Sequence, residues 1–395
     1  MKTRTLKVTG LVCLLFQAAP LCAQQEDRLQ LAEQFSEYFS RQVKAANVTG
    51  SAFAVASADG IVWIGTEGFT DTSHKQPINE DTTFRVASVS KTFAASLAGV
   101  LVDQGAFRWD DPVVDYVPTF RLKGDAGKVQ VQHLLGQSSG LVPHAYDNLI
   151  EDGVSLDRIQ NRFSELSYIC QPGHCYSYQN SVFSLIQPVI ESSTQQSYEN
   201  LMRERIFEPL DMQNASVGYE PFISNPNHAR PHVKSRGRWK TVRVKPNYYR
   251  VAPAAGINAS VTDMGKWLTA QMGGHPAVIN PDLVKELTEP RVRTVRDTRR
   301  KHWRDLLTDA HYGLGWRVYR LGEHEIIYHS GWVSGYRADV AWSEEHGIGI
   351  AVLMNVEGSS ISEITTTFWK MAFDQLQRPG AAGNAALLAA AIETR

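Results

Sequence analysis

Segments typical of β-strands lie near both ends of this 395-residue chain, and helical patterns lie between them. Near the beginning, residues 51–57 and 61–65 are short apolar runs separated by Asp59-Gly60, a dipeptide that favours a tight hairpin turn. Further strand-like runs near the end are 325–332, 336–342 and 348–354. This distribution predicts an α+β fold with one antiparallel sheet built from both chain ends.

Apolar residues at helical spacing characterise the middle of the chain. They recur over residues 89–101 and stop at Gly105, which predicts a helix there. A second helix is expected over 198–206, before Pro209, and a last one over about 361–376.

These patterns divide the chain into regions. Sheet regions are expected at residues 24–80 and 312–378, with a mainly helical region inserted at 81–311. An Ala-rich tail, 379–395, follows a Pro-Gly break and is expected to add no functional element.

The first 23 residues have the pattern of a secretory signal peptide. The basic residues Lys2, Arg4 and Lys7 precede an apolar run at 11–21, and cleavage is expected after Ala23. The apolar run is too short to span a bilayer as a helix. The sequence therefore predicts a periplasmic or secreted protein with no transmembrane segment after cleavage.

The charge distribution gives no indication of a nucleic-acid partner, because the formal net charge is only -1. Two stretches, 230–250 and 291–304, are nevertheless rich in Arg and Lys. The simpler interpretation of each is a solvated loop, and the alternative is attraction of an anionic surface or substrate. The sequence does not determine the oligomeric state.

Only Cys170 and Cys175 remain after loss of the expected leader. They enclose a Pro172-Gly173 turn and His174. Export favours a disulfide between them, with free thiols and a metal site as alternatives. Zinc needs three or four converging ligands, which His174 and two cysteines so close in sequence do not supply well. No metal and no other cofactor is expected.

The segment Ser88-Val-Ser-Lys91 opens the first long helix and contains an SxxK motif. Three residues apart on a helix, the Ser88 hydroxyl and the Lys91 amine lie on one face. A lysine removed from water can take the proton of a serine and so activate it as a nucleophile. A helix cap is the structural alternative.

Two further motifs follow. In Tyr178-Gln-Asn180 the phenol can relay a proton if Lys91 favours the phenolate, and the Asn180 amide suits a substrate amide. His329-Ser330-Gly331 lies in a predicted strand, where glycine lets another backbone approach closely. Each motif alone is more often structural than catalytic.

In this order, SxxK, YxN and HxG resemble the signature elements of the serine β-lactamase and penicillin-recognising enzyme superfamily, in the branch that includes class C β-lactamases, D,D-peptidases and esterases. Other segments that look like the family's framework are 84–91, 134–141, 207–210, 312–316 and 352–355. The resemblance covers almost the whole chain after the leader, and it implies a β-lactamase/D,D-peptidase-like fold.

The resemblance also implies an exported serine hydrolase that works through an acyl-enzyme, with β-lactam hydrolysis as the first expectation. Ser88 would be the nucleophile, Lys91 and Tyr178 the proton-transfer pair, and Asn180 a substrate clamp. The backbone amides of Ser88 and Trp332 would form the oxyanion hole. Alternatives are a D-alanyl-D-alanine peptidase, a carboxylesterase, or a sensor that binds β-lactams or peptidoglycan without turnover. All of these take a small-molecule or peptide substrate.

His329 departs from the lysine that is usual at this place in class C β-lactamases. With Ser330 and Gly331 it is expected to bind substrate, but a histidine with an ordinary pKa of about 6.5 holds a carboxylate well only when it is protonated. The histidine therefore argues against efficient β-lactam turnover, whereas it leaves the expected acyl-enzyme unaffected.

A competing motif, Gly136-Gln-Ser138-Ser-Gly140, fits the GxSxG nucleophile elbow of α/β-hydrolases. That elbow needs a strand before it and a helix after it, whereas Leu141-Val-Pro143 follows here and the surrounding pattern is helical. Ser138 is therefore not favoured as the nucleophile.

Overall fold

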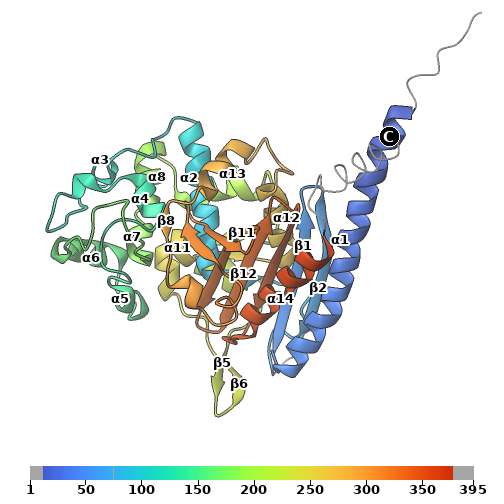
Figure 1. Cartoon of the computed structure of the whole chain (residues 1–395). Coiled ribbons are helices and arrows are strands. Elements are labelled where there is room, and N and C mark those ends of the chain that lie inside the picture. The colour runs from blue at the N-terminus through green and yellow to red at the C-terminus, as the bar shows by residue number, and fades with distance from the viewer. Residues whose placement is uncertain (1–11, 74, 377–395) are drawn as a thin grey trace, which may run out of the picture.

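An eight-stranded antiparallel sheet runs through the centre of the structure, a computed structural model that describes residues 12–73 and 75–376 (Figure 1). Its strand order is β2-β1-β13-β12-β11-β10-β9-β8. The strands are β1 Gly50–Ser57, β2 Gly60–Gly68, β8 Val292–Arg293, β9 Asp309–Tyr312, β10 Arg317–Leu321, β11 His324–Val333, β12 Tyr336–Ser343 and β13 Ile348–Met354.

Strands from the two ends of the chain pair directly, with Ser51 of β1 opposite Met354 of β13. The expected α+β fold, with one antiparallel sheet built from both ends, is confirmed. The sheet also includes β8 and β9, which begin before the boundary expected at residue 312. The expected tail at 379–395 and the first eleven residues of the expected leader lie outside the described residues.

Both faces of the sheet are buried. Helices α1 (Val12–Ala45) and α14 (Ser360–Gln375) lie side by side against one face, and α12 (Val261–Gln271) packs on the other (Figure 1). Along β1 the side chains alternate between the two faces: Phe53 packs in the core under α1 and α14, and Ala54 packs in the core under α12. Among the described residues, no helix combines the length and apolar character that a membrane span requires.

Helices predominate over strands in the segment between β2 and β8. Helix α2 (Ser90–Asp103) lies at the centre of this region, where Phe93 stacks on Trp267 with ring centroids 3.9 Å apart. The helix ends just before Gly105, whose positive φ of 76° stops it as the sequence predicts. The others are α3 Val113–Tyr116, α4 Val131–Leu135, α5 Asp147–Glu151, α6 Leu156–Asn161, α7 Asn180–Phe183, α8 Ile186–Thr194, α9 Tyr198–Met202, α10 Tyr219–Ser224, α11 Ala252–Ala255 and α13 Pro281–Thr288.

Two small sheets complete the fold. One consists of strands β3 (Phe84–Arg85), β7 (Ile257–Ala259) and β4 (Ser216–Val217). Strand β3 ends just before the SxxK segment. Strands β5 (His232–Ser235) and β6 (Arg238–Thr241) form a hairpin that projects from the body of the protein (Figure 1). Most basic side chains of the 230–250 stretch are exposed on or beside this hairpin, as in a solvated loop.

Candidate active site

The candidate nucleophile Ser88 lies in a short 3₁₀ turn, Ala87–Val89, immediately before α2. Ala87 has a φ of 51°, in the left-handed region that disfavours any residue with a Cβ atom. Such a conformation persists only where the surrounding structure enforces it. The turn places Ser88 in the wall of a cavity of about 1100 Å³.

Lys91 lies one helical turn further on and is completely buried. Its Nζ atom is 3.2 Å from Oγ of Ser88, so the two side chains share one face as the SxxK spacing predicts. The amine also donates to Oδ1 of Asn180 at 2.8 Å and to the carbonyl oxygen of Ala254 at 3.0 Å.

Burial lowers the pKa of Lys91 well below its ordinary value of 10.5, while the nearby Asp147 carboxylate works in the opposite direction. A neutral amine has two hydrogens and one lone pair. Asn180 Oδ1 and the Ala254 carbonyl oxygen only accept hydrogen bonds, so they take the two hydrogens. The lone pair is then directed at the Ser88 hydroxyl, and Lys91 can act as its base.

The Tyr178 ring lies beside this pair, with its centroid 4.7 Å from Nζ of Lys91. Burial raises the pKa of Tyr178, and a hydrogen bond with Ser88 opposes this only in part. The phenol is therefore neutral, and the idea that Lys91 favours the phenolate is not supported. A neutral phenol can still donate its proton to a leaving group.

Asn180 begins α7 and connects Lys91 to a carboxylate. Its Oδ1 accepts from Lys91, and its Nδ2 donates to Oδ2 of Asp147 at 3.1 Å. One Nδ2 hydrogen is left for a substrate. Asp147, the first residue of α5, was missed by the sequence analysis, because no local motif marks it and the fold alone brings it to Asn180.

Strand β11 passes directly over the Ser88 turn at Gly331. A Cβ atom at this glycine would lie 2.1 Å from the carbonyl oxygen of Val86 and 3.2 Å from the backbone nitrogen of Ser88, so no other residue fits without a shift. Its neighbours Ser330 and Trp332 line the cavity, and Trp332 is 60% exposed.

His329 does not lie where a substrate carboxylate would need it. The side chain is completely buried, and it is absent from the cavity wall. Burial, assisted by the positive charges of Arg317 and Lys91, lowers its pKa well below 6.5. A neutral ring satisfies both contacts: Nδ1 donates to the carbonyl oxygen of Ser330 at 2.9 Å, and Nε2 accepts from the Tyr312 hydroxyl at 3.0 Å. In this structure the His329 side chain therefore does not face the cavity, and its contact with substrate stays a prediction.

Arginines supply the positive charge that His329 does not. Nη2 of Arg300 lies 3.4 Å from Oγ of Ser330. Arg317 is buried and forms an ion pair with Asp297. Arg300 is further from this carboxylate, with its Nη1 atom 3.9 Å from Oδ1 of Asp297. The arginines that line the cavity are Arg293, Arg296, Arg300, Arg317 and Arg337. The basic stretch 291–304 supplies the first three, which favours its interpretation as part of a site for anions.

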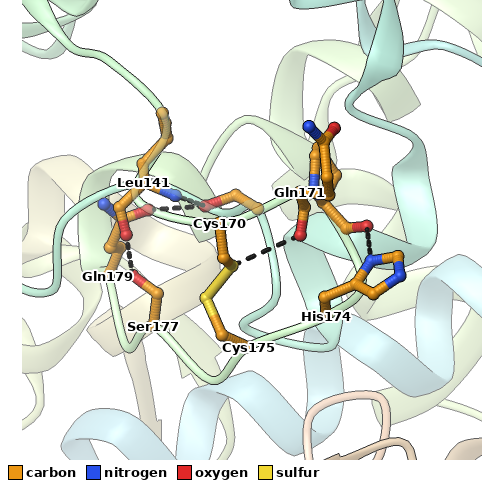
Figure 2. Close-up of a disulfide and its surroundings, with 9 residues drawn as sticks. Leu141, Cys170, Gln171, His174, Cys175, Ser177 and Gln179 are labelled. Carbon is orange, nitrogen blue, oxygen red and sulfur yellow. Dashed lines mark hydrogen bonds between the residues drawn. A yellow bond between two sulfur atoms is a disulfide. The ribbon is translucent and has the colours of Figure 1, made fainter.

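Cys170 and Cys175 form a disulfide, with their Cα atoms 6.4 Å apart, and Cys175 lines the cavity (Figure 2). The segment that the disulfide encloses rests on residues 136–141. The amide of Gly173 donates to the Ser138 carbonyl at 2.7 Å. Beyond the disulfide, Gln179 is held by Ser139, whose hydroxyl donates to Oε1 of Gln179 at 2.9 Å.

The GxSxG segment thus forms hydrogen bonds that hold the stretch of chain before Tyr178 in place. Gly140 has a φ of 77°, and a Cβ atom there would lie 2.4 Å from the Cys170 carbonyl oxygen. Ser138 is 4% exposed and is not among the residues that line the cavity. Its context is the end of a short helix, α4, and not a strand, so it does not form a nucleophile elbow.

A family model and several known proteins match this chain in sequence. The family model described as Beta-lactamase matches residues 35–367. The chain is 25% identical to "Beta-lactamase" of Escherichia coli (strain K12) over 276 residues, which cover 70% of this chain and 67% of that protein. It is 21% identical to "Protein flp" of Staphylococcus aureus (strain NCTC 8325 / PS 47) over 84% of this chain, and it spans only 64% of that protein's length.

Two solved structures have a similar fold. One is the octameric penicillin-binding protein homologue from Pyrococcus abyssi, with a TM-score of 0.77 and 21% identity over 87% of this chain and 78% of that one. The other is SurE, with a TM-score of 0.69 and 20% identity over 90% of this chain and 78% of that one. At these identities the likeness describes the fold alone.

Proposed function

Because this chain belongs to the beta-lactamase family, we propose that it is a hydrolase whose acyl-enzyme forms on Ser88, and that it opens the ring of β-lactams. The observation that carries the proposal is the buried amine of Lys91, 3.2 Å from the Ser88 hydroxyl and anchored by two fixed acceptors. A serine without such a base is a weak nucleophile.

In the proposed reaction, Lys91 takes the Ser88 proton while Oγ of Ser88 attacks the carbonyl carbon of the substrate. The backbone amides of Ser88 and Trp332 stabilise the negative charge that develops on the carbonyl oxygen. The neutral phenol of Tyr178 donates its proton to the departing nitrogen and regains one from protonated Lys91. Water then cleaves the ester on Ser88, which restores the serine.

Arg300 and Ser330 are proposed to bind a substrate carboxylate. They lie next to one another in the cavity wall. Arg317 is already neutralised by Asp297, so Arg300 is the guanidinium with more capacity for a new anion. Charge-assisted hydrogen bonds to a carboxylate are stronger than neutral ones. A carboxylate is present both in β-lactams and in peptides that end in D-alanine.

The position of Asp147 favours substrates that carry an amide N–H over simple esters. Within the described part of the chain, no protein group donates to its Oδ1 atom, which is buried at the cavity beside Asn180. An amide N–H next to the scissile carbonyl would satisfy this oxygen, and a simple ester has no such donor. Hydrolysis of a D-alanyl peptide by the same residues is therefore the second candidate, ahead of a carboxylesterase.

A turnover screen tests the proposal. Purified enzyme and a Ser88→Ala control are incubated with a penicillin, a cephalosporin, a D-Ala-D-Ala peptide and a short-chain ester, and hydrolysis is followed by liquid chromatography. We expect β-lactam hydrolysis that the control lacks. Turnover of the peptide alone would select the second candidate, and turnover of the ester alone the third. Acylation without turnover would identify a sensor.

Export is also proposed, on the basis of the leader pattern at residues 1–23. A disulfide between Cys170 and Cys175 is consistent with an oxidising compartment. N-terminal sequencing of the protein expressed in a Gram-negative host should find a mature chain that starts at Gln24 in the periplasmic fraction. A full-length chain in the cytosol would contradict export.

A further inference from the structure

A second cluster of side chains with coordinating atoms lies outside the active-site cavity, at the sheet. It consists of His324 at the start of β11 and of Glu345 and His346 in the turn between β12 and β13. None of the three lines the cavity that contains Ser88. We propose that this cluster binds a divalent transition-metal ion, with Zn²⁺ as the best fit.

Three potential ligand atoms converge in the cluster. Nδ1 of His324 is 3.2 Å from Oε1 of Glu345 and 3.2 Å from Nε2 of His346. Nε2 of His346 is 3.6 Å from the same carboxylate oxygen. Each side chain thus presents one atom to a common point.

The size of this triangle fits a zinc ion. The point equidistant from the three atoms lies about 1.9 Å from each of them, whereas zinc binds nitrogen and oxygen at about 2.0–2.2 Å. An ion slightly above the plane of the triangle would therefore contact all three atoms at normal bond lengths. Ligands of tetrahedral zinc lie about 3.3 Å apart, close to the observed spacing.

Without an ion, hydrogen bonds can hold the same three atoms together. Two neutral rings with hydrogens on Nδ1 of His324 and Nε2 of His346 can both donate to Oε1 of Glu345, at 3.2 Å and 3.6 Å. A cation takes the place of these two hydrogens, with the ring hydrogens moved to the other nitrogen of each imidazole, and contacts all three atoms at once.

The two imidazole rings are held in position before any ion binds. The His324 ring stacks on Phe373 of α14, with centroids 4.2 Å apart and planes 17° from parallel. The His346 ring lies 5.2 Å from the same phenyl ring and is 3% exposed. Ligands fixed by packing in this way do not have to be ordered when the ion arrives.

The side chains of His324 and Glu345 are partly exposed, at 27% and 25%, so an ion has access from solvent. Two imidazole nitrogens and one carboxylate oxygen suit zinc, nickel or copper better than magnesium or calcium, which prefer oxygen. Three protein ligands leave one position for water or another ligand.

Such an ion would join the start of β11 to the β12–β13 turn beneath the end of α14, and it would stabilise the folded protein by mass action. It has no part in the proposed reaction at Ser88. The sequence predicts no metal, because His324 lies far from the adjacent pair Glu345-His346 in the chain and only the pairing of β11 with β12 brings them together.

Zinc binding by the untagged full-length mature protein tests the proposal. The protein is treated with EDTA, exchanged into metal-free buffer and titrated with ZnCl₂ by isothermal calorimetry, with MgCl₂ as the comparison ion. We expect one saturable zinc site per chain, no comparable magnesium site, and a melting temperature that increases with zinc concentration.

Two variants locate the site without touching the buried His346. His324→Ala and Glu345→Gln should each weaken zinc binding at least about tenfold, because loss of a direct ligand costs no less than loss of an outer partner. His275→Ala, a histidine outside the cluster, should bind zinc as the wild type does. Absence of saturable binding in the wild type, or unchanged binding in both cluster variants, would overturn the proposal.

Discussion

The amine of Lys91 donates to the side-chain oxygen of Asn180 at 2.8 Å, inside the protein. Asn180 is itself fixed by its donation to Asp147 at 3.1 Å. This chain of contacts fixes the direction of the Lys91 amine towards Ser88, and the Asp147 carboxylate limits how far burial lowers the pKa of that amine. The reactivity of the serine is therefore set by residues from α2, α5 and α7 together.

The first prediction separates the two serine motifs. Ser88→Ala should abolish covalent labelling by a β-lactam or an acyl-phosphonate probe, because the Lys91 amine lies beside the Ser88 hydroxyl as its base. Ser138→Ala should leave labelling intact, since the contact of Ser138 with Gly173 is made by its backbone. Mass spectrometry of the labelled peptides is the measurement. An adduct on Ser138 would refute the assignment.

The second prediction concerns the pH dependence of acylation. Lys91 is active when neutral, so the acylation rate should rise as pH increases through the pKa of Lys91 and then level off. Because burial lowers this pKa, the midpoint should lie well below pH 10.5. Lys91→Arg should reduce the plateau rate by about 10²–10⁴-fold and remove the dependence on pH, because arginine stays protonated. Stopped-flow acylation from pH 5 to 10 measures the rates of the wild type and of the variant. A wild-type rate that does not change with pH would contradict the role of Lys91 as the base.

The third prediction assigns Asp147 as a positioning residue. Asp147→Asn keeps the shape of the side chain but removes the negative charge that raises the pKa of Lys91. The midpoint of the pH profile should therefore move to lower pH, while the plateau rate falls far less than in Lys91→Arg. Asp152→Asn, an exposed neighbour on the same segment, should leave the midpoint unchanged. A lower plateau with an unmoved midpoint would indicate a purely structural role.

The fourth prediction concerns anion recognition by Arg300. Arg300→Gln should raise KM for a carboxylate-bearing substrate about 10–100-fold, the range expected for loss of a charge-assisted hydrogen bond. KM for a neutral ester should change little. Arg304→Gln, an exposed arginine of the same basic stretch, serves as the matched control. Equal losses for charged and neutral substrates would argue against a carboxylate site at Arg300.

Much of the fold could be predicted from the sequence, because strand alternation and the Asp59-Gly60 turn are local signals. The expected hairpin corresponds to β1 and β2, and the last three expected strands correspond to β11, β12 and β13. The short strands β8 and β9 were missed, since two to four residues carry too little periodicity to be recognised.

The site could be predicted only where short motifs mark it. The pairing of Ser88 with Lys91 could be predicted from the SxxK motif, because one helical turn brings the two side chains together. The lowered pKa of His329 could not be predicted, because it depends on burial in the folded protein and on the positive charges of Arg317 and Lys91. The ion pair between Arg317 and Asp297 could not be predicted either, because only tertiary packing brings the two residues together.

The last prediction concerns the disulfide between Cys170 and Cys175. Closing so short a loop stabilises the folded state by about 2 kcal/mol in the chain-entropy model, a modest amount for a protein of this size. The effect on catalysis should be larger. Cys175 lines the cavity and precedes Tyr178, and a displacement of about 1 Å in a catalytic residue can cost about a hundredfold in rate.

Replacing both cysteines with serine should therefore lower the acylation rate of Ser88 more clearly than it lowers the melting temperature. The hydrogen bonds from residues 136–141 remain in this variant, so the segment should stay folded while its end near Tyr178 becomes less well fixed. Stopped-flow acylation and differential scanning calorimetry on the same preparation compare the two effects. A large drop in melting temperature with an unchanged acylation rate would show that the disulfide serves stability alone, and two free thiols in the unfolded, unreduced wild type would show that it does not form.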